Sequence, residues 1–351
     1  MKYSPHPILF LTVLMLFLAG CAKDKTIQPQ NPLAPCVLTD SLMIPVKDTL
    51  LTLPFCNSPF GWQWVYTRRY QYFAPCFNPN NQNELVYGRQ DRQGDIYSTE
   101  IRILDLCTGK DRLISNNGYV SPWTQWSKTD WILFTGNDGN LWKVKSSGTD
   151  LIKISAGSNF NNDAVWNYDG SKILFRQQAN HNDYILVTNQ DGIIEDTIEK
   201  LVASGYWSWG MPDKLAIVTP NPFPGDGIGY YDFTRNTIVQ IKAIPQDPNN
   251  NSLLKRSVKW FNQYKALLWS SIGMVSVTDT LTAASVTLRA GSDYFEYGNT
   301  SVSANDKKIA IERLDKTIKD TIGINWFLNY ENNIYLMNSD GSDWRRIKFP
   351  E

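Results

Sequence analysis

Short apolar runs recur along the chain, and each is bounded by polar residues typical of turns. Within a run the apolar residues are consecutive, without strict alternation of apolar and polar positions, which favours β-strands buried on both faces. Successive runs start about 40 to 50 residues apart, the spacing typical of β-propeller blades. The six runs are residues 83–88, 131–135, 171–175, 214–218, 265–269 and 308–312.

The apolar runs have similar neighbours on both sides. An aromatic or apolar residue precedes each run by a few positions, with a polar turn between them, which is typical of a β-hairpin. These preceding residues are Phe77, Trp126, Trp166, Trp209, Trp260 and Val302. A third strand follows, as in residues 139–144 and 333–338, and a fourth closes the unit, as in residues 151–154 and 345–348.

Four strands in each of six units predict an all-β fold, a six-bladed β-propeller of four-stranded antiparallel blades at residues 70–349. The expected blades are residues 70–115, 116–155, 156–200, 201–242, 243–290 and 291–349. The alternative is a β-sandwich or two separate β domains, but sandwich strands alternate inward and outward residues and do not recur as a unit of about 40 residues.

Two segments resemble the repeat of the TolB-type propeller family. Residues 163–175 (DAVWNYDGSKILF) resemble its first half, P-x-W-S-P-D-G-x-x-I-A-F, and residues 333–342 (NIYLMNSDGS) resemble its second half, D-I-Y-x-M-N-x-D-G-S. Residues 78–80 (NPN) in blade one and 210–213 (GMPD) in blade four depart from the repeat. The resemblance covers residues 70–349 and implies a six-bladed propeller.

The N-terminus has the features of an export signal. Lys2 is followed by an apolar run at residues 8–18 and then by Ala19-Gly20-Cys21. The run is shorter than the roughly 20 residues that span a bilayer. Residues 18–21 (LAGC) resemble the lipobox of bacterial lipoproteins, which implies a signal peptide at residues 1–20 and lipid on Cys21. The alternative is an ordinary secretory signal in which Cys21 is incidental.

Residues 21–35 are polar and rich in proline, which predicts a flexible tether. Residues 36–69 are expected to form an N-terminal segment packed on the propeller. Lys23-Asp24, close behind the cysteine, resembles the surface-export signal of Bacteroidetes lipoproteins. The expected location is the bacterial cell envelope, with a lipid anchor in a membrane, the outer membrane in particular, facing either the periplasm or the cell surface.

Charge and histidine content exclude several classes of function. The chain has 34 basic and 34 acidic residues, so it lacks the basic excess of nucleic-acid-binding proteins. Of its two histidines, His6 lies in the signal, and His181 alone cannot supply a multi-histidine metal site, such as that of TolB-type relatives which degrade pectic oligosaccharides. The recurring Asp-Gly pairs fit tight turns and lack the calcium-loop pattern. No cofactor or metal is indicated.

Four cysteines follow Cys21, all in the first third of the mature chain: Cys36, Cys56, Cys76 and Cys107. Export makes disulfides between them plausible, and their connectivity stays open. Cys76 is expected on the first strand of blade one and Cys107 after the third. First and third strands lie roughly 10 Å apart, too far for a disulfide, so we expect bridges from Cys36 or Cys56 to one of these two.

Aromatic residues gather in the segments predicted as loops at one end of the blades. Two connections between second and third strands look enlarged, residues 220–227 and residues 317–332, and the connections between blades add further rings. The candidate binding face consists of Phe223, Trp326, Phe327, Tyr330, Trp207, Tyr206, Tyr119, Phe160, Tyr294 and Phe295. These rings either contact a partner or pack beneath their own loops.

The expected function is non-catalytic binding of an envelope protein or glycan by a propeller face. The alternative is a carbohydrate-active enzyme that uses carboxylates at the central channel, a chemistry that leaves no local sequence signature. No hydrolase motif G-x-S-x-G is present, and no catalytic residue is assigned.

Overall fold

The computed structural model divides the chain into two compact units, Met1–Ala34 and Pro35–Glu351. All described residues lie in the second unit. They are residues 42–46, 63–65, 69–93, 96–119, 123–155, 160–179, 182–199, 201, 207–219, 227–244, 255–261, 263, 265–271, 273–291, 295–322 and 325–350. No helix in these ranges is long and apolar enough to cross a membrane. The signal, Cys21, the tether, Cys36, Cys56 and His181 lie outside them.

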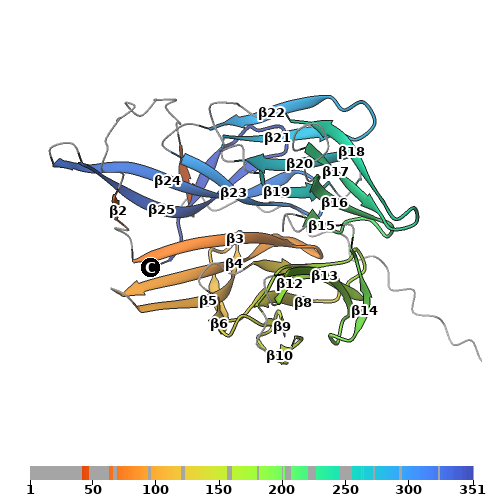
Figure 1. The fold of residues 1–351 in the computed structure, drawn as a ribbon. Coiled ribbons are helices and arrows are strands. Elements are labelled where there is room, and N and C mark those ends of the chain that lie inside the picture. The colour runs from red at the N-terminus through yellow and green to blue at the C-terminus, as the bar shows by residue number, and fades with distance from the viewer. Residues whose placement is uncertain are drawn as a thin grey trace, which may run out of the picture. The chain divides into compact units, whose positions relative to one another are not determined.

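The second unit is a six-bladed β-propeller of antiparallel sheets, which confirms the predicted fold (Figure 1). Blade one is β3 (Tyr70–Asn78), β4 (Asn81–Gln93), β5 (Ile96–Asp105) and β6 (Asp111–Gly118). Blade two is β7 (Thr124–Trp126), β8 (Trp131–Thr135), β9 (Leu141–Lys145) and β10 (Ile152–Lys153). Blade three is β11 (Phe160–Trp166), β12 (Lys172–Ala179), β13 (Asn182–Asn189) and β14 (Ile194–Thr197).

The other three blades repeat this order. Blade four is β15 (Trp207–Ser208), β16 (Lys214–Thr219), β17 (Gly227–Asp232) and β18 (Thr237–Ala243). Blade five is β19 (Lys255–Trp260), β20 (Ala266–Ser271), β21 (Met274–Asp279) and β22 (Ser285–Ala290). Blade six is β23 (Phe295–Val302), β24 (Lys308–Ile322), β25 (Asn325–Asn338) and β26 (Arg345–Ile347).

The six apolar runs of the sequence fall on the second strands β4, β8, β12, β16, β20 and β24. These strands are buried on both faces because each blade packs between two others; Ile132, Leu133 and Phe134 of β8, for example, are all fully buried. The aromatic residues that precede the runs end the inner strands and join the cores between blades, as Trp126 and Trp166 do. Consecutive apolar residues are therefore the signature of this fold.

The N-terminal segment closes the ring. Its strand β1 (Met43–Pro45) pairs antiparallel with β26, and β2 (Gln63–Val65) pairs parallel with β25, so both add to blade six. Leu42 and Met43 are buried in one core together with side chains of blade one and blade six. The strands of this segment extend the last blade, and its side chains fill the seam between blades one and six.

Two neighbouring blades carry long hairpins between their second and third strands. The second strands β4 and β24 have 13 and 15 residues, whereas β8, β12, β16 and β20 have 5, 8, 6 and 6. In Figure 1 both long hairpins extend to the left, where β2 lies beside β25. The expectation of a long loop at residues 317–332 is therefore wrong, because residues 317–322 and 325–332 continue β24 and β25 as paired strands, with one register shift between Ile318 and Asp320.

Candidate functional site

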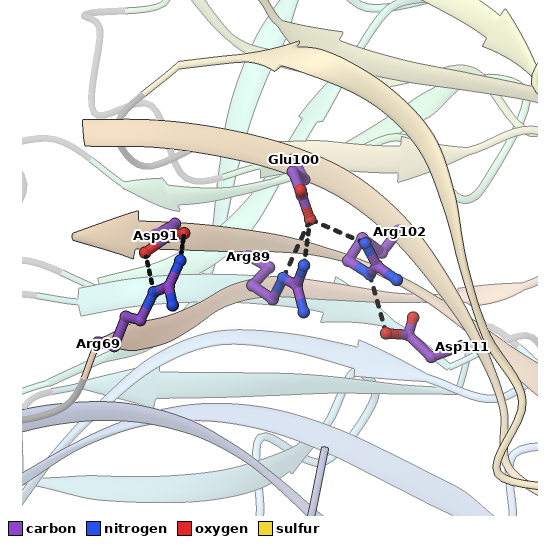
Figure 2. Close-up of polar contacts among 6 residues, drawn as sticks. All are labelled: Arg69, Arg89, Asp91, Glu100, Arg102 and Asp111. Carbon is purple, nitrogen blue, oxygen red and sulfur yellow. Dashed lines mark hydrogen bonds and ion pairs between the residues drawn. The ribbon is translucent and has the colours of Figure 1, made fainter. Parts of the chain in front are cut away.

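The extended part of blade one carries a row of alternating charges. Arg89 of β4 lies directly opposite Glu100 of β5, and Tyr87 lies opposite Arg102. Since side chains of a strand alternate between its faces, Arg89, Glu100 and Arg102 share one face with Tyr87. Tyr87 packs with blade-six residues, so this face is turned toward blade six. We call Arg69, Arg89, Asp91, Glu100, Arg102 and Asp111 the charge ladder (Figure 2).

Each cation of the charge ladder is paired. The Arg69 guanidinium donates to both carboxylate oxygens of Asp91 at 2.8 Å, a bidentate arrangement. Glu100 accepts from Arg89 at 2.7 Å and from Arg102 at 2.8 Å (Figure 2). Arg102 also donates to Asp111 at 2.8 Å. Charge-assisted bonds of this kind fix side chains in one geometry, so the ladder holds the base of the hairpin rigidly.

Aromatic rings line the outer part of the same hairpin. The guanidinium groups of Arg69 and Arg89 lie 5.0 and 4.6 Å from the ring centroid of Tyr70. Near the tip, the guanidinium of Arg92 lies 4.8 Å from the ring of Tyr97, which is 47% exposed. Arginine and tyrosine side chains with one exposed edge are the residue types that contribute most to protein interfaces. By strand alternation Tyr70 lies on the face of the charge ladder, whereas Arg92 and Tyr97 lie on the opposite face, so each face of the hairpin presents an Arg–Tyr contact.

Blade six carries a second polar cluster. It lies on the face of blade six that is turned toward blade five, away from blade one. Arg313 pairs with Asp315 at 2.7 Å and donates to the hydroxyl of Tyr335 at 2.6 Å, while that hydroxyl donates to Asp315 at 2.7 Å. The same guanidinium lies over the rings of Tyr335 and Trp344, at 4.0 and 5.5 Å. Burial, reinforced by Asp315, raises the pKa of Tyr335, so its phenol stays protonated. This cluster anchors the second hairpin.

Asp163 is the most perturbed acid among the described residues. It lies in a β-bulge of the inner strand β11 at φ 55°, a conformation that a non-glycine residue rarely adopts. Its carboxylate is 3.5 Å from Arg176, which is also 4.0 Å from Asp183. Burial, opposed by Arg176 and reinforced by Asp183, raises the pKa of Asp163 to about 7. A strained, half-protonated carboxyl on an inner strand is suited to proton transfer.

The predicted aromatic face is brought together only in part. Trp207 is 1% exposed and its indole N–H donates to the carbonyl of Asp163, while Tyr330 is 3% exposed. Tyr119 and Phe160 are half-buried and pack on each other, with ring centroids 5.1 Å apart. Trp207 and Tyr330 are therefore core residues because the structure encloses their rings, and they offer no surface to a partner.

The remaining predicted rings lie outside the described side chains. Trp326 and Phe327 are placed on β25 and Phe295 begins β23, with their side chains undescribed, and Phe223, Tyr206 and Tyr294 fall in undescribed segments. Sequence reasoning missed the charge ladder, which could have been found from alternate charges on two adjacent strands. Arg89, Asp91, Glu100 and Arg102 have the required period of two.

Cys107 is disulfide-bonded, and its partner lies outside the described residues. Cys76 is a buried free thiol on the inner strand β3, so it takes part in no bridge and is not joined to Cys107. Its assignment as a disulfide candidate is therefore wrong, because the side chain is enclosed between inner strands. The bond at Cys107 lies directly after β5, on the blade that carries the charge ladder. Within the described ranges no three metal-ligating side chains gather.

Comparisons with known proteins show the fold. The sequence matches no protein-family model and no curated protein. A putative TolB from Agrobacterium tumefaciens is similar at a TM-score of 0.52 and 12% identity, over 80% of this chain and 88% of that chain. At this identity the similarity extends to the fold alone, and it agrees with the TolB-like repeat seen in the sequence.

Two enzymes of known structure resemble this chain with lower TM-scores than the TolB protein. An oligogalacturonate lyase in complex with manganese has a TM-score of 0.49 at 11% identity, over 79% of this chain and 77% of that chain. A gluconolactonase from Xanthomonas campestris has the same TM-score and identity, over 70% of this chain and 84% of that chain.

Proposed function

We propose that this chain is an exported, lipid-anchored protein of the bacterial envelope, and that it binds a protein or glycan partner with the face from which β4–β5 and β24–β25 project. The observation that carries the proposal is the pair of long hairpins on neighbouring blades (Figure 1). Function in propellers resides in such projecting segments, because the blades themselves serve the packing of the ring.

The chemistry of the projecting hairpin supports binding. The charge ladder holds Arg69 and Arg89 in place before a partner arrives, which reduces the entropy that association costs. At the tip, Tyr97 and Arg92 present an exposed ring and a cation together. Such a pair can stack on a sugar ring or enter a pocket of a protein.

The binding test compares two exposed tyrosines at opposite ends of the blades. Tyr97 lies in a connection between second and third strands, and Tyr168, 37% exposed, lies in a turn between first and second strands with Lys128 5.5 Å from its ring. Tyr97→Ala should reduce crosslinking to the envelope partner at least about tenfold, and Tyr168→Ala should leave it unchanged. Equal capture by both variants would refute the proposed face.

Anchoring is tested separately. Cys21→Ser should abolish incorporation of labelled fatty acid and release the protein from the membrane fraction, since the acyl chain is the proposed anchor. A wild-type protein that takes up no fatty acid would remove the lipoprotein part of the proposal and leave the binding face in place.

A second candidate function is a carbohydrate-active enzyme, favoured by Asp163 alone. A carboxyl whose pKa lies near 7 can act as a general acid at neutral pH. An enzyme would lose turnover in the Asp163→Asn variant, whereas the binding protein would keep partner capture.

A further inference from the structure

Lys259 occupies an unusual position on the propeller axis. The inner strands of six blades surround this axis. The residues that directly precede the six aromatic or apolar positions Phe77, Trp126, Trp166, Trp209, Trp260 and Val302 form one level around it. This level consists of Cys76, Gln125, Val165, Ser208, Lys259 and Ser301. Lys259 is its only cation, and it is 8% exposed.

The side chain of Lys259 reaches across the axis. Its ammonium lies 5.3 Å from the ring centroid of Trp123, the residue before β7. Lys259 belongs to blade five and Trp123 precedes the inner strand of blade two, and these blades are opposite each other in a ring of six. A contact between opposite blades has to pass through the centre of the ring. The ammonium therefore lies at the axis itself.

Among the described residues, no acidic side chain pairs with Lys259. The thiol of Cys76 is the titratable group that faces it, and no described carboxylate forms an ion pair or hydrogen bond with it. Burial lowers the pKa of Lys259 to about 8, so at pH 7 about nine-tenths of the side chain is charged. A buried charge without a partner is unfavourable, and an anion would remove that cost.

A second buried lysine, Lys143, has hydrogen-bond partners for its ammonium and serves as a comparison. Lys143 of β9 is 2% exposed and also lies over an indole, 4.6 Å from Trp131. Its ammonium donates to the carbonyl of Gln190 at 2.6 Å and to Asp191 at 3.2 Å. The ammonium of Lys143 thus has two oxygen partners in its blade, whereas no described oxygen atom accepts a hydrogen bond from Lys259 at the axis.

We propose that Lys259 and Trp123 form a binding site on the propeller axis for a small organic monoanion that carries one carboxylate. The single ammonium matches one negative charge, whereas a phosphate dianion needs more cations than this level provides. The indole of Trp123 offers an apolar surface to the body of the ligand. This site is separate from the proposed binding face and does not depend on it.

The test uses D-glucuronate, benzoate and inorganic phosphate as probes in calorimetric titrations of the full mature chain. Wild-type protein should bind at least one of the two carboxylates and bind phosphate more weakly. Lys259→Met should weaken carboxylate binding at least about tenfold, the loss expected for a charge-assisted bond. Lys143→Met should leave it unchanged. Absence of carboxylate binding, or its retention in Lys259→Met, would overturn the proposal.

A second measurement needs no variant. Lysines of the wild-type protein are labelled by reductive 13C-methylation, and their NMR signals are followed against pH. One lysine signal, distinguished from the α-amino signal by its chemical shift, should titrate near pH 8, and a saturating carboxylate should raise its midpoint by at least about one unit, because the ligand binds the ammonium form. A midpoint that does not move with ligand would contradict the site even if every variant unfolded.

Discussion

Blade one and the propeller axis differ in how they pair buried charge. In blade one, Arg102 is largely buried and lies 2.8 Å from both Glu100 and Asp111. At the axis, Lys259 is also buried, and the described groups that face its ammonium are the indole of Trp123 and the thiol of Cys76. A paired buried charge serves the fold, because losing either partner is costly, whereas a buried cation without a carboxylate partner gains from binding an anion.

The largest expected effect comes from breaking the charge ladder at its centre. Arg102→Met should lower the free energy of unfolding by about 2 to 4 kcal/mol, because Asp111, 5% exposed, keeps its buried charge without a cation. Denaturant titration at neutral pH measures the loss. Arg69→Met is the control, since the Arg69 side chain is 55% exposed and water can replace it, so the midpoint should not change. If both variants lost the same free energy of unfolding, the buried Arg102–Asp111 pair would contribute no more to stability than the exposed Arg69–Asp91 pair.

Removing the charge at the axis should stabilise the protein, whereas removing Arg102 from the charge ladder should destabilise it. The pKa of Lys259 is about 8 in the folded protein and 10.5 in the reference state, so between these values the unfolded chain holds more protons and stability rises with pH. Lys259→Met should remove that rise and increase the free energy of unfolding at pH 7 by on the order of 2 kcal/mol. Thermal unfolding between pH 6 and pH 10 measures both effects.

The matched variant Lys143→Met should instead destabilise by about 1 kcal/mol, because Gln190 and Asp191 lose their donor. A loss of stability in both lysine variants would show that Lys259 has a partner in the fold, and the contrast between axis and blade would fail.

The smallest effect concerns Asp163. Its pKa of about 7 in the fold lies above the ordinary 3.8, so the folded state holds more protons between these values and stability falls as pH rises from about 4 to 7. Asp163→Asn should flatten that fall and stabilise the protein above pH 7 by on the order of 1 kcal/mol, because loss of the ion pair with Arg176 offsets most of the burial cost that the variant removes. Asparagine tolerates φ 55°, whereas Asp163→Ala adds backbone strain at the same position. A slope unchanged in the asparagine variant would assign the pH dependence to another group.

The sequence by itself determined the architecture. Its six apolar runs, the rings before them and the turns between them predicted six four-stranded blades, and the structure has them. The local pattern was sufficient because each blade is a meander of consecutive strands. The same order of buried and exposed strands therefore recurs along the sequence from one blade to the next. The repeat also placed Cys76 on an inner strand, and the separation of first and third strands predicted that Cys76 and Cys107 are not bonded to each other.

The candidate sites depended on contacts between distant segments, and only the tertiary structure decided them. The seam joins Leu42 and Met43 to blades one and six, and the hairpin at residues 317–332 became visible as strands only through the register of β24 with β25. Trp207 looked like a surface ring until blade three covered it. Lys259 meets Trp123 because closure of the ring brings residues 136 positions apart to one axis, and no local pattern records which side chains a closed ring will place face to face.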